Sequence, residues 1–159
     1  MNVTLLTVGS LKERYWREAV AEYEKRLSVY CKFHLLEVKD EKTPEALDSA
    51  AALRVRQKEG ERLLERIDPR ALVVTLEIQG KKYNSESFAA EMAKLEERSR
   101  GELVFVIGGS LGLSAGVSQR AALHLSFSDF TFPHQLMRLI ALEQLYRSFK
   151  INAGEPYHK

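Results

Sequence analysis

The stretch Leu103–Gly112 constrains the fold most, because an unbroken apolar run stops there at a pair of glycines. The run from Leu103 to Ile107 contains only aliphatic, β-branched and aromatic residues, which is typical of a strand buried on both faces within a parallel sheet. Gly108 and Gly109 then let the backbone turn sharply and leave space for a ligand. Ligands of open α/β sheets bind beyond the carboxyl ends of strands, so this turn is the first candidate site. An ordinary tight turn is the alternative.

The composition is that of a globular protein. A chain of 159 residues with 45% hydrophobic and 29% charged residues predicts one domain over residues 1–159. No apolar stretch approaches the roughly 20 residues of a membrane-spanning helix, and the first residues do not resemble a signal peptide, so we expect a cytoplasmic protein without membrane contact. Cys31 is the only cysteine, which predicts a small buried residue and no disulfide. The net charge of +2 permits a nucleic-acid partner without indicating one.

Predicted strands and helices alternate along the chain. We expect strands over residues 3–8, 33–38, 71–78, 102–107 and 123–127, and helices over residues 12–27, 44–67, 86–98, 114–120 and 133–152. Ser10 and Thr43 stand where the first two helices need N-caps, and Gly60 is a candidate interruption of the second helix. This order predicts α/β architecture, with a mostly parallel sheet of about five strands and helices on both faces.

The charged stretch from Arg54 to Arg66 and the histidine at position 124 are best explained by structural roles and not by functional ones. Between Arg54 and Arg66, basic and acidic residues are interleaved, which favours a solvated, salt-bridged helix over an RNA-binding surface. His124 falls on the strand face opposite Leu123 and Leu125. We therefore expect His124 to be hydrogen-bonded or solvated and not catalytic.

The last predicted helix is apolar around more than one side. Such a helix is expected to be buried on two sides, and in a small domain the second side predicts a subunit interface, hence a homodimer. His134 and Arg138 share one face of this helix at i,i+4 spacing, as do Glu143 and Arg147. Charges set into so apolar a helix must be paired with one another or must face a wet cleft. Both interpretations stay open on spacing alone.

Three predicted strands end in loops of glycine or small polar residues, at Leu76–Gly80, Gly108–Gly112 and Phe127–Phe132. If these strands are parallel neighbours, their loops share one edge of the sheet and form one pocket. The glycine loop lacks the Lys-Ser/Thr of a phosphate-binding loop and the spacing of a dinucleotide fold, so ATP and NAD are disfavoured. Apolar walls with little positive charge suit an adenosine without phosphates. The four histidines lack metal-ligand spacing, and metal catalysis is not expected.

Several motifs resemble one known family. They are Phe105-Val106-Ile107-Gly108-Gly109-Ser110-x-Gly112-Leu113, Leu125-Ser126-Phe127-Ser128, Phe132-Pro133-His134-Gln135-x-Met137-Arg138, Glu143-Gln144-x-Tyr146-Arg147 and Pro156-Tyr157-His158-Lys159. Together they resemble the ribosomal large subunit methyltransferase H family, which belongs to the SPOUT class. The likeness covers nearly the whole chain, although Lys42 to Val55 matches none of these motifs.

The resemblance implies S-adenosylmethionine as cofactor, a homodimer and a trefoil knot near the C-terminus that holds the cofactor. It also implies that the substrate is N3 of a pseudouridine in 23S ribosomal RNA, within the assembled ribosome. The implied cofactor-binding residues lie in the same three loops that the strand pattern indicates: Leu76, Gly108, Phe127, Ser128, Asp129, Phe130, Thr131 and Phe132.

Six residues are candidates for the catalytic set: His134, Arg138, Glu143, Arg147, Tyr157 and His158. His158 or His134 is expected to accept the imide proton, because an imidazole titrates near neutral pH. Arg138 and Arg147 are expected to hold phosphate or the developing negative charge, and Tyr157 to stack on the target base. The tail of one subunit then completes the pocket of the other.

Two other functions are compatible with these features. One is a non-catalytic ribosome-binding factor with a vestigial cofactor pocket, which would not bind S-adenosylmethionine. The other is an α/β enzyme that acts on a small metabolite, which would methylate a small acceptor but no ribosome.

Overall fold

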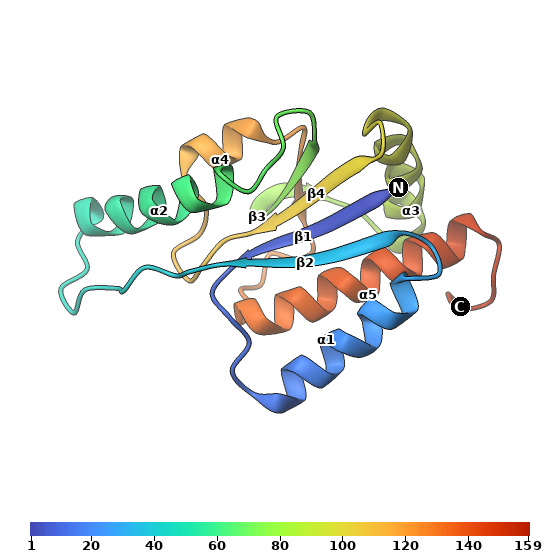
Figure 1. Ribbon diagram of the computed structural model, residues 1–159, viewed down its shortest axis with the longest axis horizontal. Coiled ribbons are helices and arrows are strands. Elements are labelled where there is room, and N and C mark those ends of the chain that lie inside the picture. Colours follow the sequence, from blue (N-terminus) through green and yellow to red (C-terminus); the bar gives the residue numbers. More distant parts are fainter.

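The apolar run at Leu103 forms a central strand of a five-stranded parallel sheet in the computed structural model, which describes residues 1–159 (Figure 1). The strand order is β2-β1-β4-β3-β5, and every neighbouring pair is parallel. The strands are β1 (Asn2–Val8), β2 (Lys32–Val38), β3 (Leu72–Lys82), β4 (Glu102–Ile107) and β5 (Leu123–Ser126). The helices are α1 (Arg14–Leu27), α2 (Ser49–Leu64), α3 (Ser85–Arg98), α4 (Ala115–Arg120) and α5 (His134–Asn152). The predicted architecture is confirmed.

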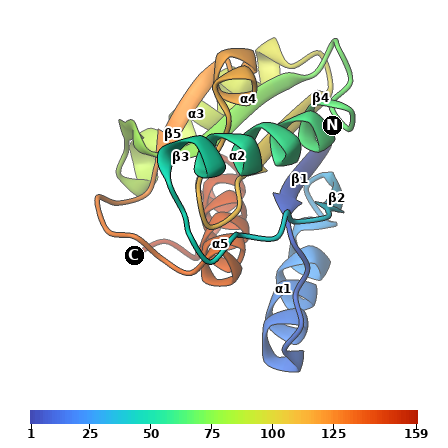
Figure 2. The same cartoon turned by 90° about the vertical axis from the view of Figure 1, so that its left-hand side faces the viewer.

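Helices cover both faces of the sheet, which explains why β4 is apolar throughout. Helices α1, α3 and α5 lie on one face and α2 and α4 on the other (Figures 1 and 2). Leu103 and Phe105 belong to a core cluster of 17 buried residues beneath the first face, whereas Val104 and Val106 belong to a cluster of ten beneath the second. Successive side chains of a strand point to opposite faces, so a strand covered twice has no position for a polar residue.

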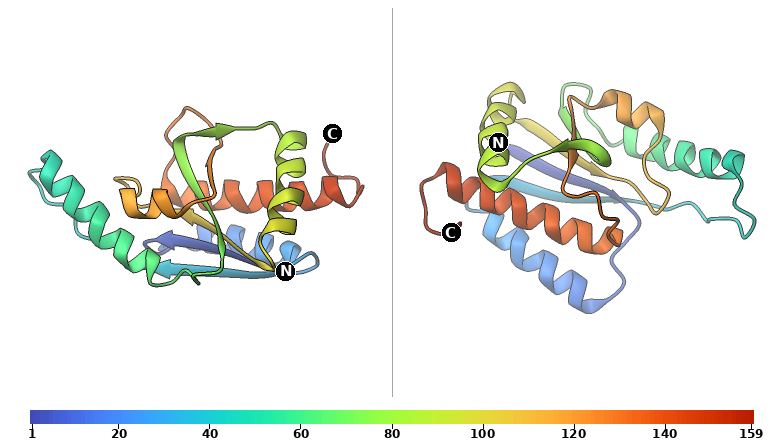
Figure 3. Two further views of the ribbon diagram at one scale, coloured as in Figure 1. Left: turned by 90° about the horizontal axis from the view of Figure 1, so that it is seen from above. Right: turned by 180° about the vertical axis from the view of Figure 1, so that it is seen from behind.

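Strand β3 is longer than expected and curls across β5. Its pairing with β5 shifts register between Leu76 and Lys81, and the strand continues to Lys82. A Cβ on Gly80 would lie 2.7 Å from the backbone carbon of Leu125, so the two backbones touch there. Both views of Figure 3 show the end of β3 (green) beside the chain that follows β5 (brown). The predicted end at Ile78 is wrong, because the apolar pattern stops where the strand leaves the core.

Two predicted helix starts are wrong. Helix α1 begins at Arg14 without a side-chain cap, and Ser10 stays outside it. Helix α2 begins at Ser49, because Asp48 caps it by accepting a hydrogen bond from the N–H of Ala51 at 2.7 Å. Thr43 has the side chain of an N-cap, but Asp48 is an equally good one by residue type, and the structure places the helix start after Asp48.

Helix α2 is continuous through Gly60, so the suspected interruption is absent. Gly60 instead allows close approach of α4, because a Cβ there would lie 2.2 Å from Ser114 Oγ. Helix α5 ends as expected, with Gly154 following at a φ of +67°. None of the helices has the length and apolar character needed to cross a bilayer. Cys31 is 7% exposed, and burial raises the pKa of its thiol to about 11.

Candidate functional site

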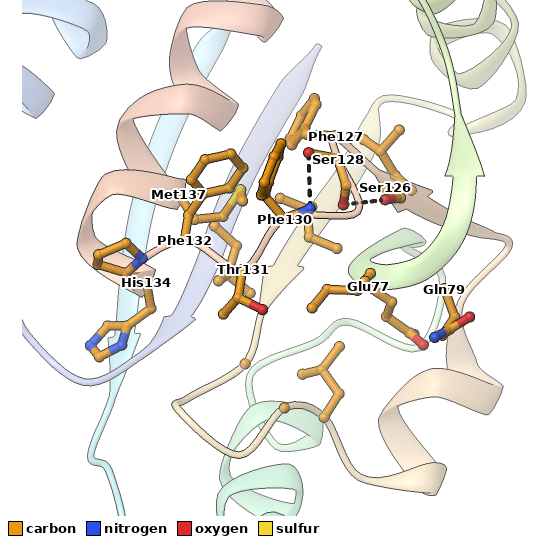
Figure 4. Close-up of a pocket in the computed structure, with 18 of the residues that line it drawn as sticks. Glu77, Gln79, Ser126, Phe127, Ser128, Phe130, Thr131, Phe132, His134 and Met137 are labelled. Atoms are coloured by element: carbon orange, nitrogen blue, oxygen red, sulfur yellow. Dashed lines mark hydrogen bonds between the residues drawn. The ribbon is translucent and has the colours of Figure 1, made fainter.

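The carboxyl ends of β4, β3 and β5 meet at one edge of the sheet and enclose a pocket (Figure 4). These strands are parallel neighbours, so the loops that follow them converge as expected. The pocket has a volume of about 640 Å³, within the usual range of small-molecule sites. Each predicted loop contributes to its wall, with Leu76 and Ile78, Gly108 and Gly109, and Phe127, Phe130 and Phe132.

The pocket lining carries almost no charge. Its only acidic or basic side chains are those of Glu77 and His134. Burial and the nearby guanidinium of Arg138 lower the pKa of His134, so its imidazole is neutral at pH 7. Neither lysine nor arginine lines the pocket. Phosphates are usually held by such side chains, so the lining suits a nucleoside better than a nucleotide.

Hydrogen bonds of two serines shape the loop Phe127–Phe132. Ser126 Oγ donates to the carbonyl oxygen of Ser128 at 3.1 Å, and Ser128 Oγ accepts from the N–H of Phe130 at 3.0 Å. Figure 4 shows these bonds beside the pocket. Phe130 lines the pocket yet is 76% exposed, which places its ring at the mouth. The loop therefore combines a fixed backbone with an aromatic side chain that faces solvent.

The glycine turn after β4 rests on a buried carboxyl. The N–H of Gly112 donates to the carbonyl oxygen of Gly109 at 3.0 Å and closes the turn. Behind Gly109, Glu59 of α2 is only 4% exposed, and a Cβ on Gly109 would lie 2.9 Å from its Oε1. Glu59 Oε2 accepts from the N–H of Glu41 at 3.0 Å, and burial raises the pKa of this carboxyl. The glycine turn therefore packs closely against Glu59 of α2.

Arg138, a predicted anion-binding residue, is fully buried. Its guanidinium donates to Glu37 Oε2 at 2.7 Å and to the carbonyl oxygens of Val8 and Gly9 at 3.1 and 2.7 Å. These bonds join α5 to the ends of β1 and β2. Without exposed surface, Arg138 does not reach a substrate phosphate in this structure, and it instead positions α5 beneath the pocket.

The remaining four predicted catalytic residues lie outside the pocket and contact one another. We call them the tail cluster: Glu143, Arg147, Tyr157 and His158. Arg147 pairs with Glu143 at 2.5 Å, and the Tyr157 hydroxyl donates to the same carboxylate at 3.0 Å. Arg147 Nη1 lies 3.1 Å from Nδ1 of His158, and its guanidinium carbon lies 4.7 Å from the centroid of the Tyr157 ring. Burial, with Tyr23 and Glu143 nearby, raises the pKa of Tyr157. These contacts hold the C-terminal residues against α5.

The pocket and the tail cluster lie at different places along α5. His134 is the first residue of α5 and lines the pocket. Arg147 follows it by about 20 Å, at about 1.5 Å of rise per residue. In Figure 1 the chain turns back after α5, and the C-terminus lies beside the C-terminal end of the helix. One chain therefore does not bring its own tail cluster to its own pocket.

The pocket lining includes residues that are not among the sequence-based candidates, and it omits one that is. Glu77, Gln79 and Met137 line the pocket but are not among those candidates. The signal for Glu77 was present, since it is the one charged residue in the apolar run of β3. Asp129 was a candidate, but it is not among the lining residues, and its carboxylate pairs with Lys82.

The structure agrees with the interpretation of His124 as a hydrogen-bonded residue and of the region from Arg54 to Arg66 as a salt-bridged helix. His124 is half-exposed, and its Nδ1 lies 3.0 Å from a carboxylate oxygen of Glu77. On α2, Arg62 and Lys58 pair with Glu41 at 2.7 and 3.5 Å. The acid partner thus comes from the loop between β2 and α2, and not from a neighbouring turn of the helix.

The chain also matches known proteins over its length. A family model described as "Predicted SPOUT methyltransferase" matches residues 1–158. Ribosomal RNA large subunit methyltransferase H of Pediococcus pentosaceus is 55% identical over 159 residues, covering 100% of each chain. The structure of a probable methylase family protein from Haemophilus influenzae Rd KW20 has a TM-score of 0.51 and 12% identity, over 99% of this chain and 70% of that one, which is a likeness of fold alone. With this sheet, this pocket and these matches, the chain belongs to the SPOUT methyltransferase family.

Proposed function

We propose that this protein is a homodimeric, S-adenosylmethionine-dependent methyltransferase that modifies N3 of a pseudouridine in 23S ribosomal RNA within the assembled ribosome. The observation that carries this proposal is the largely apolar pocket, without lysine or arginine, at the ends of β3, β4 and β5 in a SPOUT chain. The rRNA substrate is supported by the full-length relative named as an rRNA large subunit methyltransferase. The modified atom and the ribosomal context come from the family resemblance of the motifs.

The lining residues fit the proposed cofactor. Leu76 and the Phe127–Phe132 loop offer aliphatic and aromatic surface for an adenine ring, and the glycines at 108 and 109 expose backbone to the ligand. These segments would hold S-adenosylmethionine, whose adenosine carries no phosphate. In this role the knot implied by the family keeps the three loops together.

When bound, S-adenosylmethionine supplies a methyl group that is already strongly electrophilic. The protein then has to align the acceptor nitrogen with that methyl and remove the imide proton. His134 lines the pocket and is neutral at pH 7, so it is suited to accept this proton. Phe132 and Met137 beside it give this side of the pocket an apolar wall.

A second subunit is the proposed source of the tail that completes each pocket, because the tail cluster lies about 20 Å of helix from its own pocket. The half-buried Leu136, Leu139 and Ile140 on α5 offer apolar surface for that partner. Across the interface, Tyr157 would stack on the target base, and Arg147, oriented by Glu143, would balance the negative charge that develops on it. His158 is then the alternative proton acceptor.

The direct test supplies methyl-labelled S-adenosylmethionine together with assembled ribosomes, separated subunits or naked rRNA. We expect label in 23S rRNA of assembled ribosomes, with mass spectrometry placing the methyl group on a pseudouridine. If the protein binds ribosomes but neither binds S-adenosylmethionine nor transfers label, the non-catalytic ribosome-binding function replaces this one. Transfer to a small acceptor alone would favour a metabolite enzyme.

The tail is tested by replacing Tyr157 and His158 with alanine together. We expect methylation of ribosomes to be lost, because the base loses its stacking partner, while calorimetry shows S-adenosylmethionine affinity within about twofold of the original. Tyr15→Ala, at an exposed tyrosine on α1, is the matched control. Unchanged turnover in the double variant would remove the tail from the mechanism.

A further inference from the structure

Glu77 is the one acidic side chain on the pocket wall, and the mechanism above does not use it. It directly follows Leu76 at the point where β3 leaves the core, and Figure 4 shows it across the pocket from His134 and Met137. Its side chain is 26% exposed, so it is neither in the core nor free in solvent. A carboxylate in an otherwise apolar ligand site requires a physical reason.

Three side chains hold one oxygen of this carboxylate. Glu77 Oε1 accepts from Thr75 Oγ1 at 2.7 Å and from Ser118 Oγ at 2.9 Å, and it lies 3.0 Å from Nδ1 of His124. The three groups come from β3, α4 and β5. Burial disfavours the charge, but the three hydrogen bonds together outweigh it and leave the pKa of Glu77 below its usual value. The carboxylate is therefore fixed in place and ionised at neutral pH.

The second oxygen is free. Glu77 Oε2 makes no hydrogen bond within the chain and is not among the buried polar atoms. The imidazole of His124 approaches Oε1, and no lysine or arginine lines the pocket. A carboxylate in a partly desolvated site without a lysine or arginine on the pocket wall attracts a positively charged ligand more strongly than it would in water.

We infer that Glu77 recognises positive charge on the methyl donor, at its sulfonium or its ammonium group. The inference rests on the proposed function, since it assumes that S-adenosylmethionine occupies the pocket. Under it, the network from Thr75, Ser118 and His124 serves to present an ionised oxygen to the ligand. Glu77 is then a specificity-determining residue that favours cationic over neutral adenosine derivatives.

Three ligands separate the charges in a calorimetric test. S-adenosylmethionine carries both sulfonium and ammonium, S-adenosylhomocysteine carries only the ammonium, and 5′-methylthioadenosine carries neither. In Glu77→Gln we expect S-adenosylmethionine to bind about tenfold more weakly, as for loss of a charge-assisted contact, and 5′-methylthioadenosine to change by less than about twofold. If Glu77→Gln also binds S-adenosylhomocysteine more weakly, Glu77 recognises the ammonium group. If its affinity for S-adenosylhomocysteine is unchanged, Glu77 recognises the sulfonium.

Glu97→Gln on α3 is the matched control, because it removes the same charge from an exposed residue outside the pocket. An equal loss for all three ligands in Glu77→Gln would overturn the inference, since it would mean a structural or ribose-binding role. Unchanged affinity for S-adenosylmethionine would also overturn it. If the original protein binds none of the three ligands, the proposed function fails and this inference with it.

A second variant keeps the test decisive if Glu77→Gln does not fold. Glu77→Asp keeps the charge but withdraws it by one methylene, so the preference for S-adenosylmethionine over 5′-methylthioadenosine should fall by several-fold. A preference identical to that of the original protein would overturn the inference. Thermal unfolding of each variant confirms that the comparison is made on folded protein.

Discussion

Position 109 leaves little space for a side chain, because the pocket turn packs against a buried carboxyl and a buried valine. A Cβ on Gly109 would lie 2.9 Å from Glu59 Oε1 and 3.2 Å from Val8 Cγ1. We expect Gly109→Ala to lower the free energy of unfolding by about 1–3 kcal/mol, as overpacking in a core does. Urea unfolding measures this loss, and calorimetry should show weaker S-adenosylmethionine binding.

Gly116→Ala is the control for this prediction, since its added Cβ would meet only Leu64 Cδ1 at 3.7 Å. In a helix that change should be neutral or stabilising by up to about 1 kcal/mol. Adding Glu59→Ala to Gly109→Ala should restore part of the cofactor affinity by removing the closest atom. If Gly109→Ala alone kept the stability and the S-adenosylmethionine affinity of the original protein, close packing of the turn against Glu59 would be contradicted.

The pH dependence of methyl transfer tests His134. Its pKa lies below the ordinary imidazole value, because burial and the Arg138 charge disfavour the protonated form, so the neutral form predominates at pH 7 and is lost only in more acidic solution. We expect single-turnover rates to fall on acidification, with the midpoint of the fall below the ordinary imidazole pKa. His134→Asn should be slower and should lack this acidic limb. An unchanged limb in His134→Asn would identify a different proton acceptor.

One buried guanidinium adds polar contacts between helix α5 and the sheet, on which the apolar residues of α5 also pack. Arg138 bonds Glu37 and two backbone carbonyl oxygens at the ends of β1 and β2, so its removal leaves acceptors without partners. Arg138→Leu should lower the free energy of unfolding by about 2–4 kcal/mol. Urea unfolding at neutral pH measures the difference.

The control for Arg138 is Arg14→Leu on α1, where the guanidinium pairs with Glu18 on the surface and both side chains are mostly exposed. Exposed pairs contribute little, so we expect a change within about 0.5 kcal/mol. If Arg138→Leu is no less stable than Arg14→Leu, the hydrogen bonds from Arg138 to the ends of β1 and β2 do not contribute to the free energy of unfolding.

If the tail acts across subunits, each active site of the dimer combines the pocket of one chain with the tail of the other. Co-expression of two inactive variants tests this arrangement. One variant carries Ser110→Trp, which fills the pocket mouth; the other lacks the side chains of Tyr157 and His158. A mixed dimer then holds one intact pocket and one intact tail on different chains. We expect co-expression to restore about half the activity per mixed dimer.

Each parent variant alone, isolated in the same way, provides the baseline for that experiment. Sedimentation should show each protein as a dimer of similar mass, because neither change lies on the apolar surface of α5. Activity that stays at the level of the parents in a verified mixed dimer would mean that each tail serves its own chain.

Much of the fold follows from local patterns. The run at Leu103 predicts a doubly covered strand because no polar residue interrupts it, and the glycines after it predict the turn. The three loops at Leu76, Gly108 and Phe127 point to one pocket because parallel neighbouring strands end at a common edge. Such features depend on residues close together in sequence.

What the sequence by itself determined about this protein is the kind and order of its elements, the pocket edge and the family motifs. Only the tertiary structure decided that Arg138 is buried, that Asp48 and not Thr43 caps α2, and that the tail cluster lies far along α5 from the pocket. It also brought Glu77 together with Ser118 and His124. The physical reason is that burial and pairing of a charge depend on residues distant in sequence, whereas strand and helix patterns are read within one segment.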